Sequence, residues 1–242
     1  MIEVSATGST ISGDDGNDTI TVYDATGSRV FGGAGDDLIT VTENEGARVI
    51  VEAGSGNDTI DASDVASGLL YGDDGDDTIL VSGTNYAGTG QTAVPFGGAG
   101  DDLIVYEGSP LNPLDARYEN PVQLVGGEDA DTFRIVFDQG SPISDQDISE
   151  GTERVTMATL VVIDDFEPGI DTLEIDASVT NSACELSEVR LEEDEQEGTT
   201  SVIVSYTSET EVNCDVVITV NATGVDIDDL VLPDGLAMEE VA

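Results

Sequence analysis

The sequence is marked first by the residue types that it lacks. Its 242 residues include no histidine, no lysine and no tryptophan, only two cysteines, and six basic residues that are all arginine. Without histidine, a Ser-His-Asp triad, a Cys-His pair and an HExxH zinc site cannot form. Zinc and copper also prefer nitrogen and sulfur ligands, which this chain hardly offers. The composition therefore excludes most familiar catalytic centres within the chain.

Positive charge is the second scarcity. Against six arginines stand 52 acidic residues, for a formal net charge of −46. Such a surface repels nucleic acid and anionic lipid, so we expect neither as a partner. It also repels itself, so a compact state needs either bound divalent cations at fixed sites or a salty medium. Bound cations predict acids in register along the fold, whereas adaptation to salt predicts acids scattered over every surface.

Long apolar runs are missing as well. No stretch approaches the roughly 18 to 20 apolar residues of a membrane span. The first ten residues, MIEVSATGST, contain neither a basic region nor an apolar run, so they do not read as a Sec-type signal peptide. A removed signal, or a start inside a longer protein, stays open.

What the chain does contain is a nine-residue phrase repeated six times. The copies are GDDGNDTIT, GGAGDDLIT, AGSGNDTID, GDDGDDTIL, GGAGDDLIV and GGEDADTFR, which start at Gly13, Gly32, Ala53, Gly72, Gly97 and Gly126. The sixth position is always aspartate: Asp18, Asp37, Asp58, Asp77, Asp102 and Asp131. The eighth is always large and apolar: Ile20, Ile39, Ile60, Ile79, Ile104 and Phe133. The fourth is glycine except in the last copy, where it is Asp129.

The spacing of the copies predicts a repeat architecture. Successive copies start 19, 21, 19, 25 and 29 residues apart. One short strand follows each aspartate, as in Thr19–Val22, and another precedes the next glycine loop, as in Arg29–Phe31. Short strands that alternate with glycine-rich turns at such a period are typical of stacked coils. We therefore predict an all-β chain, a right-handed parallel β-roll or β-helix, with an antiparallel β cap at its C-terminus.

Metal geometry gives a physical reason for the phrase. A tight glycine turn directs carbonyl oxygens inward and adds one aspartate carboxylate, and the turn of the next coil lies about 4.8 Å away. Two stacked turns then form a cage of oxygens, the ligand that Ca²⁺ prefers. The fifth position is Asn or Asp in the first five copies, and we expect it to support the turn through bonds to the backbone.

The phrase resembles the GGxGxDxUx nonapeptide of RTX (hemolysin-type) calcium-binding proteins, a family that forms β-rolls. The departures are Asp14 and Asp73 at position two, Ala53 at position one and Asp129 at position four. Family members usually carry tandem nonapeptides, with calcium on both edges of the roll. Here the intervening halves, such as YDATGSRV, lack the motif. The resemblance therefore implies one ladder of about five calcium ions along a single edge.

The resemblance also implies the ligands, which come from positions one, three, four and six of the copies. In chain order these are Gly13, Asp15, Gly16, Asp18, Gly32, Ala34, Gly35, Asp37, Ala53, Ser55, Gly56, Asp58, Gly72, Asp74, Gly75, Asp77, Gly97, Ala99, Gly100, Asp102, Gly126 and Asp131. No catalytic residue and no other cofactor is implied.

The repeat stops near residue 138. We expect the roll to span residues 1–137, a linker or loop to span 138–158, and a β cap to span 159–242. The segment DDFEPGIDTLEID resembles the DFxxGxDxL segment that often follows RTX rolls, which implies Asp165 and Asp171 as ligands of a last calcium site. A β-turn that closes a hairpin at Glu167–Gly169 is the alternative.

The cap holds two further features. We predict strands at 186–192, 201–206 and 216–220, and a solvated hairpin loop at Glu192–Glu197. Cys184 and Cys214 are expected to pair in an oxidising compartment, with free thiols as the alternative. The last segment, GVDIDDLVLPDGLAMEEVA, resembles the ends of RTX proteins. This resemblance implies an uncleaved type I secretion signal and export from a bacterium.

The sequence therefore predicts a secreted calcium-binding protein that folds when it meets extracellular Ca²⁺, with a structural, surface or adhesion role. The calcium ions and the type I export machinery are its expected partners, with no membrane span. The alternative is the non-catalytic RTX tail of a larger secreted enzyme such as a hydrolase. A threonine-lined ice-binding face is a weaker third idea, because Asp61 and Leu80 interrupt the row that Thr21 and Thr40 begin.

Overall fold

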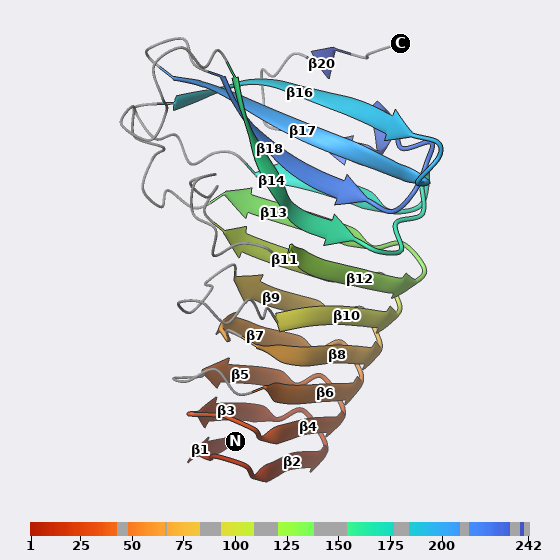
Figure 1. The fold of residues 1–242 in the computed structure, drawn as a ribbon. Helices are drawn as coiled ribbons and strands as arrows, with labels where there is room; N and C mark the ends of the chain where they lie inside the picture. Colours follow the sequence, from red (N-terminus) through yellow and green to blue (C-terminus); the bar gives the residue numbers. More distant parts are fainter. Residues whose placement is uncertain are drawn as a thin grey trace.

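The computed structural model describes residues 1–42, 48–65, 67–82, 93–108, 121–137, 154–176, 184–208, 213–232 and 238–239. For residues 137, 154–160, 184–186, 206–208, 213–215 and 238–239 it describes the backbone alone. Two sheets face each other, and the chain passes from one to the other at every turn (Figure 1). The unequal spacing of the copies also predicts two long loops, at 84–92 and 108–121, on the side opposite the glycine turns; these lie almost entirely outside the described residues.

The sheet that follows the aspartates, called sheet A here, has nine strands. In spatial order they are β1 (Ile2–Ser5), β3 (Thr19–Tyr23), β5 (Leu38–Thr42), β7 (Thr59–Asp64), β9 (Thr78–Ser82), β11 (Leu103–Gly108), β13 (Thr132–Phe137), β15 (Thr172–Asp176) and β19 (Leu230–Val231). All of its pairings are parallel.

The sheet that precedes the aspartates, called sheet B, has eleven strands. They are β2 (Thr10–Asp15), β4 (Arg29–Ala34), β6 (Val49–Ser55), β8 (Gly68–Asp74), β10 (Ala93–Ala99), β12 (Val122–Glu128), β14 (Arg154–Ile163), β18 (Asn213–Val220), β17 (Thr199–Ser208), β16 (Cys184–Asp194) and β20 (Met238–Glu239). The first eight are parallel neighbours, and β18, β17 and β16 pair antiparallel. This is the predicted all-β roll with an antiparallel C-terminal part.

The core consists of columns of stacked side chains between the sheets, contributed by both of them. The eighth-position residues align strand by strand, from Ile20 through Ile39, Ile60, Ile79 and Ile104 to Phe133, and each is fully buried. Burying one such side chain contributes about 1.5 to 3 kcal/mol. Because each coil buries its side chain only against its neighbours, the stack has one-dimensional order and fixes the spacing of the turns at its edge.

The parallel roll does not end near residue 137. Strands β14 and β15 add a seventh coil on β12 and β13, and β18 and β19 stack on them in turn. Strand β14 already begins at Arg154, inside the segment expected to be a linker. The core column continues through Leu173, which aligns with Phe133 and is fully buried. The loop before Leu173 keeps only part of the phrase, with Gly169, Asp171 and Leu173 at its fourth, sixth and eighth positions, so the sequence repeat weakens before the structural repeat does.

The Glu167–Gly169 turn does not close a hairpin. Strand β14 belongs to sheet B and β15 to sheet A, so this loop connects the two sheets as the earlier loops do. The antiparallel strands instead extend the edge of sheet B. The predicted hairpin loop is present, since the Asp194 carboxylate accepts hydrogen bonds from the amides of Gln196 and Glu197 at 2.9 and 3.2 Å.

The two cysteines lie on β16 and β18, and their side chains are outside the described residues. Strand β17 lies between these strands, with Ser208 opposite Cys184 and Tyr206 opposite Cys214. Two strand spacings amount to about 9.6 Å, which exceeds the Cα separation that a disulfide spans. The backbone register therefore does not support the expected pairing. Within the described parts of the chain, no helix is long and apolar enough to cross a membrane.

Candidate metal centre

The six glycine loops stack along one edge of the roll, at the right of Figure 1, where each sheet B strand turns into a sheet A strand. The register keeps equivalent positions of neighbouring loops side by side: Asp14 aligns with Gly33, and Gly33 with Gly54. One loop edge is therefore built from six copies of the same phrase, as the sequence predicts.

The sixth-position aspartates form an inner ladder. In each of the first five copies, the aspartate backbone N–H donates to Oδ1 of the aspartate one coil further on. These bonds measure 2.7 Å to Asp37, Asp58 and Asp77, 2.8 Å to Asp102 and 2.9 Å to Asp131. A sixth bond, from Asp131 to Asp171, measures 3.0 Å. The row of carboxylates thus continues into the seventh coil.

The second carboxylate oxygen is the strongest sign of a cation site. Oδ2 is buried without a hydrogen-bond partner in Asp37, Asp58, Asp77 and Asp102, and these residues are 2 to 3% exposed. A buried carboxylate oxygen without a partner costs several kcal/mol unless a cation or a donor meets it. Four such oxygens at the same place in consecutive coils indicate a repeated cation site.

At three of these positions, those of Asp37, Asp77 and Asp102, a backbone carbonyl of the next coil faces the same space as Oδ2. A Cβ atom added at Gly72 would lie 2.2 Å from Oδ2 of Asp77 and 2.5 Å from the carbonyl oxygen of Gly97. The corresponding distances at Gly97 are 2.1 Å to Asp102 and 2.4 Å to Gly126. The position-one glycine thus keeps open a small space that a carboxylate and a carbonyl share. This is a cradle of hard oxygen donors, of the kind that calcium prefers.

Position two belongs to the loop edge too, although the predicted ligand set omits it. Its residues all have positive φ, and the carbonyl of each approaches the next coil: a Cβ at Gly54 would lie 2.0 Å from the Gly33 carbonyl oxygen. Asp14 and Asp73 adopt φ of 68° and 74°, which aspartate tolerates better than most residues. The signal in the sequence is that position two is glycine or aspartate in all six copies.

The predicted position-three residues participate through their backbone. The position-four N–H of one coil donates to the position-three carbonyl of the next, at 2.6 Å from Gly16 to Ala34 and 2.7 Å from Gly35 to Ser55. One lone pair of each carbonyl is therefore used between coils. Position-four residues have positive φ throughout, from 113° at Gly16 to 136° at Gly75, and Asp129 replaces glycine with φ of 79°.

The fifth position forms an outer ladder that runs in the opposite direction. The side chain of Asn17 accepts from the N–H of Asp36 at 3.1 Å, Asp36 accepts from Asn57 at 3.0 Å, and the pattern continues to Asp101. These side chains are exposed. They connect neighbouring coils rather than support their own turn. In the first four coils asparagine and aspartate alternate at this position, so two carboxylates are never adjacent there.

At the last repeat, Asp165 and Asp171 meet the loop edge as expected. Asp165 accepts from the Gly126 N–H at 2.9 Å, and Asp171 accepts from Asp131 and, through its other oxygen, from Glu167 at 2.7 Å. Further along, Asp229 accepts from the Gly169 N–H at 2.7 Å and is buried directly before β19. No pattern in the sequence marks Asp229, because its loop does not follow the phrase.

Four of the buried aspartates, Asp58, Asp77, Asp102 and Asp131, have a pKa well above the ordinary value for aspartate. Burial raises the pKa of Asp58 to about 6, and those of Asp77, Asp102 and Asp131 to about 7. The donated N–H lowers each pKa in part, while the neighbouring carboxylates raise it further. Ionising the row therefore costs free energy that a bound cation would recover.

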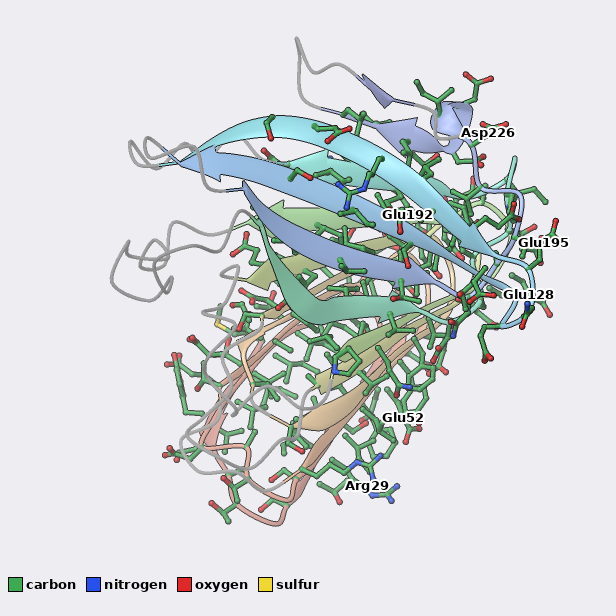
Figure 2. The ribbon with its side chains drawn as sticks, turned by 45° about the horizontal axis from the view of Figure 1, so that its top comes forward. Arg29, Glu52, Glu128, Glu192, Glu195 and Asp226 are labelled. Atoms are coloured by element: carbon green, nitrogen blue, oxygen red, sulfur yellow. The ribbon has the colours of Figure 1, made fainter. Side chains whose placement is uncertain are left out.

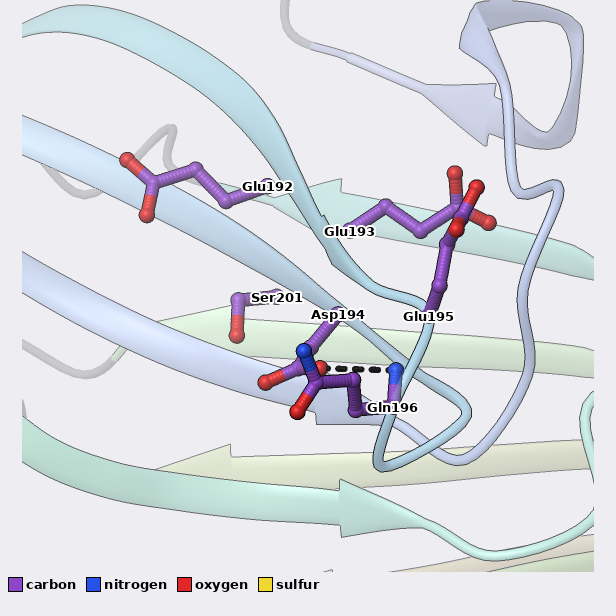
Figure 3. Close-up of a pocket in the computed structure, with 6 residues that line it drawn as sticks. All are labelled: Glu192, Glu193, Asp194, Glu195, Gln196 and Ser201. Carbon is purple, nitrogen blue, oxygen red and sulfur yellow. Dashed lines mark hydrogen bonds between the residues drawn. The ribbon is translucent and has the colours of Figure 1, made fainter.

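Acidic side chains also occur away from the loop edge. Glu52, 4.0 Å from Arg29, lies on the roll, and Glu192 and Glu195 lie on the C-terminal hairpin (Figure 2). The hairpin acids line a shallow pocket in which Asp194 caps its own turn (Figure 3). Within the described residues, no three acidic side chains converge as a metal-binding group, so a cage at the loop edge must draw largely on carbonyl oxygens.

Fold and site together define a calcium-binding parallel β-roll whose donor loops lie along one edge. In the comparison with protein families, the chain matches the RTX calcium-binding nonapeptide repeat in four copies, at residues 7–24, 28–41, 50–64 and 69–85. The repeats of residues 7–85 are thus RTX calcium-binding repeats, and the fifth and sixth loops continue the same stack. No curated protein matches the chain in sequence.

The raised pKa values predict how metal-free stability depends on pH. Because each folded-state pKa exceeds the ordinary value of 3.8, the metal-free fold binds more protons than the unfolded chain between about pH 4 and 7. Through these groups its stability should be highest below about pH 4, fall as the pH rises from 4 to 7, and level off above that. Thermal unfolding of chelator-treated protein checks this. A metal-free fold that is more stable at pH 8 than at pH 5 would contradict the buried ladder.

Proposed function

We propose that the loop edge holds a row of Ca²⁺ ions that folds the chain in the extracellular medium. The observation that carries this proposal is the set of four buried Oδ2 atoms without partners, three of which share a small space with a carbonyl of the next coil. Calcium would neutralise a like-charged row that has raised pKa values. Without calcium, repulsion between the ionised carboxylates would keep the chain unfolded at neutral pH.

The proposed cages use position-one carbonyls and sixth-position carboxylates, with position-two, position-three and position-four backbone oxygens nearby. Oδ2 has no partner in four loops, so we assign at least four ions. A fifth would belong to Asp131, where a Cβ at Gly126 would lie 2.1 Å from Oδ2. At the first loop, the Asp18 side chain is partly exposed, so we count no ion there.

The wider role that fits these features is a secreted, non-catalytic module with a structural, surface or adhesion function. RTX repeats support a structural part directly, and the chain has no histidine for the usual hydrolytic centres. Export by a type I pathway from a bacterium, with the signal in the last residues, belongs to the same proposal. The alternative is that this chain is the calcium-binding tail of a larger secreted enzyme.

Isothermal titration of the metal-free chain with CaCl₂, in the presence of excess MgCl₂, tests the proposal. We expect four or five Ca²⁺ ions per chain, because Mg²⁺ gives up its water too reluctantly to fill carbonyl-rich cages. Binding of one ion or none would overturn it, and so would equal heats with MgCl₂ alone.

A further inference from the structure

The third loop differs from the others at its first position. Ala53 stands there, and its side chain is fully buried, whereas the other five copies have glycine. The register places Ala53 between Gly32 and Gly72, so its methyl group stands where an added Cβ would stand in the glycine loops, beside the Asp58 carboxylate. This difference bears on the calcium row, so any inference drawn from it rests on the proposed function.

The glycine loops show how little room that methyl has. At Gly32, Gly72 and Gly97, an added Cβ would be 2.1 to 2.5 Å from both the carboxylate Oδ2 and the next carbonyl. Real Cβ atoms essentially never come within 3.0 Å of another heavy atom in this way. Around Ala53 the carboxylate and carbonyl oxygens must therefore lie farther from the Cβ position than in the glycine loops, by roughly half an ångström or more.

Calcium tolerates little of such a change. Its oxygen ligands lie within a window of about 2.3 to 2.6 Å, so a displacement of half an ångström takes at least one donor out of range. The methyl group is apolar, cannot rotate away and fills space that a further ligand or water would use. Oδ2 of Asp58 nevertheless remains buried without a partner.

We infer that the cage of Ala53, Asp58 and Gly72 is a distinct, weaker calcium site that divides the row between the third and fourth coils. The cages of Asp37, on one side, and of Asp77 and Asp102, on the other, are the tight ones. The backbone does not require glycine at position one, since none of these glycines has positive φ, so the methyl acts through space alone.

Calcium titration of the full chain and two variants tests the inference. Wild type should show one site at least tenfold weaker than the others. Ala53→Gly should bring that site into the tight class without stabilising the calcium-free protein, because glycine adds freedom to the unfolded chain. Gly97→Ala, which puts the same methyl into the Asp102 cage, should create a second weak site.

The outcomes separate this inference from the proposed function. If wild type binds no calcium, the calcium row itself is wrong. If wild type binds its ions in one class and neither variant changes any affinity, the row stands and the division at Ala53 is overturned. The inference would also be overturned if Ala53→Gly bound calcium more tightly only to the extent that it stabilised the calcium-free protein. The gain in affinity would then come from easier folding and not from the cage.

Discussion

Replacing Asp77 by asparagine should stabilise the calcium-free protein and at the same time weaken its response to calcium. Oδ1 of Asp77 accepts the N–H of Asp58 at 2.7 Å, a bond that asparagine can keep. The second oxygen is buried without a partner, and an amide there removes a charge whose pKa is raised from 3.8 to about 7. At pH 8 the gain is on the order of 2 to 4 kcal/mol in the free energy of unfolding without metal.

With calcium the sign reverses. The substitution removes the Asp77 carboxylate from its cage, and the neighbouring coils lose the contacts that the bound ion would order. We expect the calcium concentration at the folding midpoint to rise more than tenfold. Chemical denaturation in chelator and calcium titration followed by circular dichroism measure the two effects.

Asp76→Asn is the matched control, because it makes the same change of charge one residue away. Asp76 is exposed in the outer ladder, where its side chain accepts from the Asp101 N–H at 3.1 Å. Asparagine occupies the same position in two other coils, so this variant should change both quantities little. An Asp77→Asn protein that is less stable without metal and keeps its calcium midpoint would contradict the cage.

Gly75→Ala should be among the most damaging single substitutions in the roll. Gly75 has φ of 136°, and an added Cβ would lie 1.9 Å from the Gly56 carbonyl oxygen, which belongs to backbone and cannot turn away. Separating the two coils to relieve this contact breaks the ladders on both sides. We expect the free energy of unfolding in saturating calcium, measured by denaturant unfolding, to fall by more than about 3 kcal/mol.

Gly16→Ala separates the crowding from the backbone strain. Gly16 holds the same position in the first loop with φ of 113°, but an added Cβ meets nothing within 4 Å. Gly16→Ala should lower the free energy of unfolding by only about 1 to 2 kcal/mol, the cost of placing alanine at positive φ. Equal losses in the two variants would show that close contact between coils does not set the glycine requirement.

The inner part of the roll could be predicted because one residue type carries each constraint. A column of isoleucines fills the core, and one aspartate per coil marks the loop edge, so Ile79 and Asp77 can be placed from spacing alone. Chain order also placed the antiparallel strands correctly. These features depend on local periodicity, which a sequence displays directly.

Other features depend on contacts between coils and leave weaker marks. The direction of the two ladders follows from how the loops stack, and nothing in Asp77 or Asp76 alone reveals it. Asp171 continues the inner row from a loop of different length, so the roll was expected to end about one coil too early. Position two is missing from the predicted ligands. Its residues share a need for positive φ, which glycine meets in four copies and aspartate, as at Asp73, meets in the other two.

In the proposed function a bound divalent ion, rather than ionic strength, permits this acidic chain to fold. Far-ultraviolet circular dichroism of the chelator-treated protein at pH 8 tests this, with CaCl₂ titrated in one series and NaCl at equal ionic strength in the other. We expect a β-sheet signal that appears cooperatively with calcium and is absent with sodium alone. Folding in NaCl at physiological ionic strength would contradict it and favour adaptation to salt.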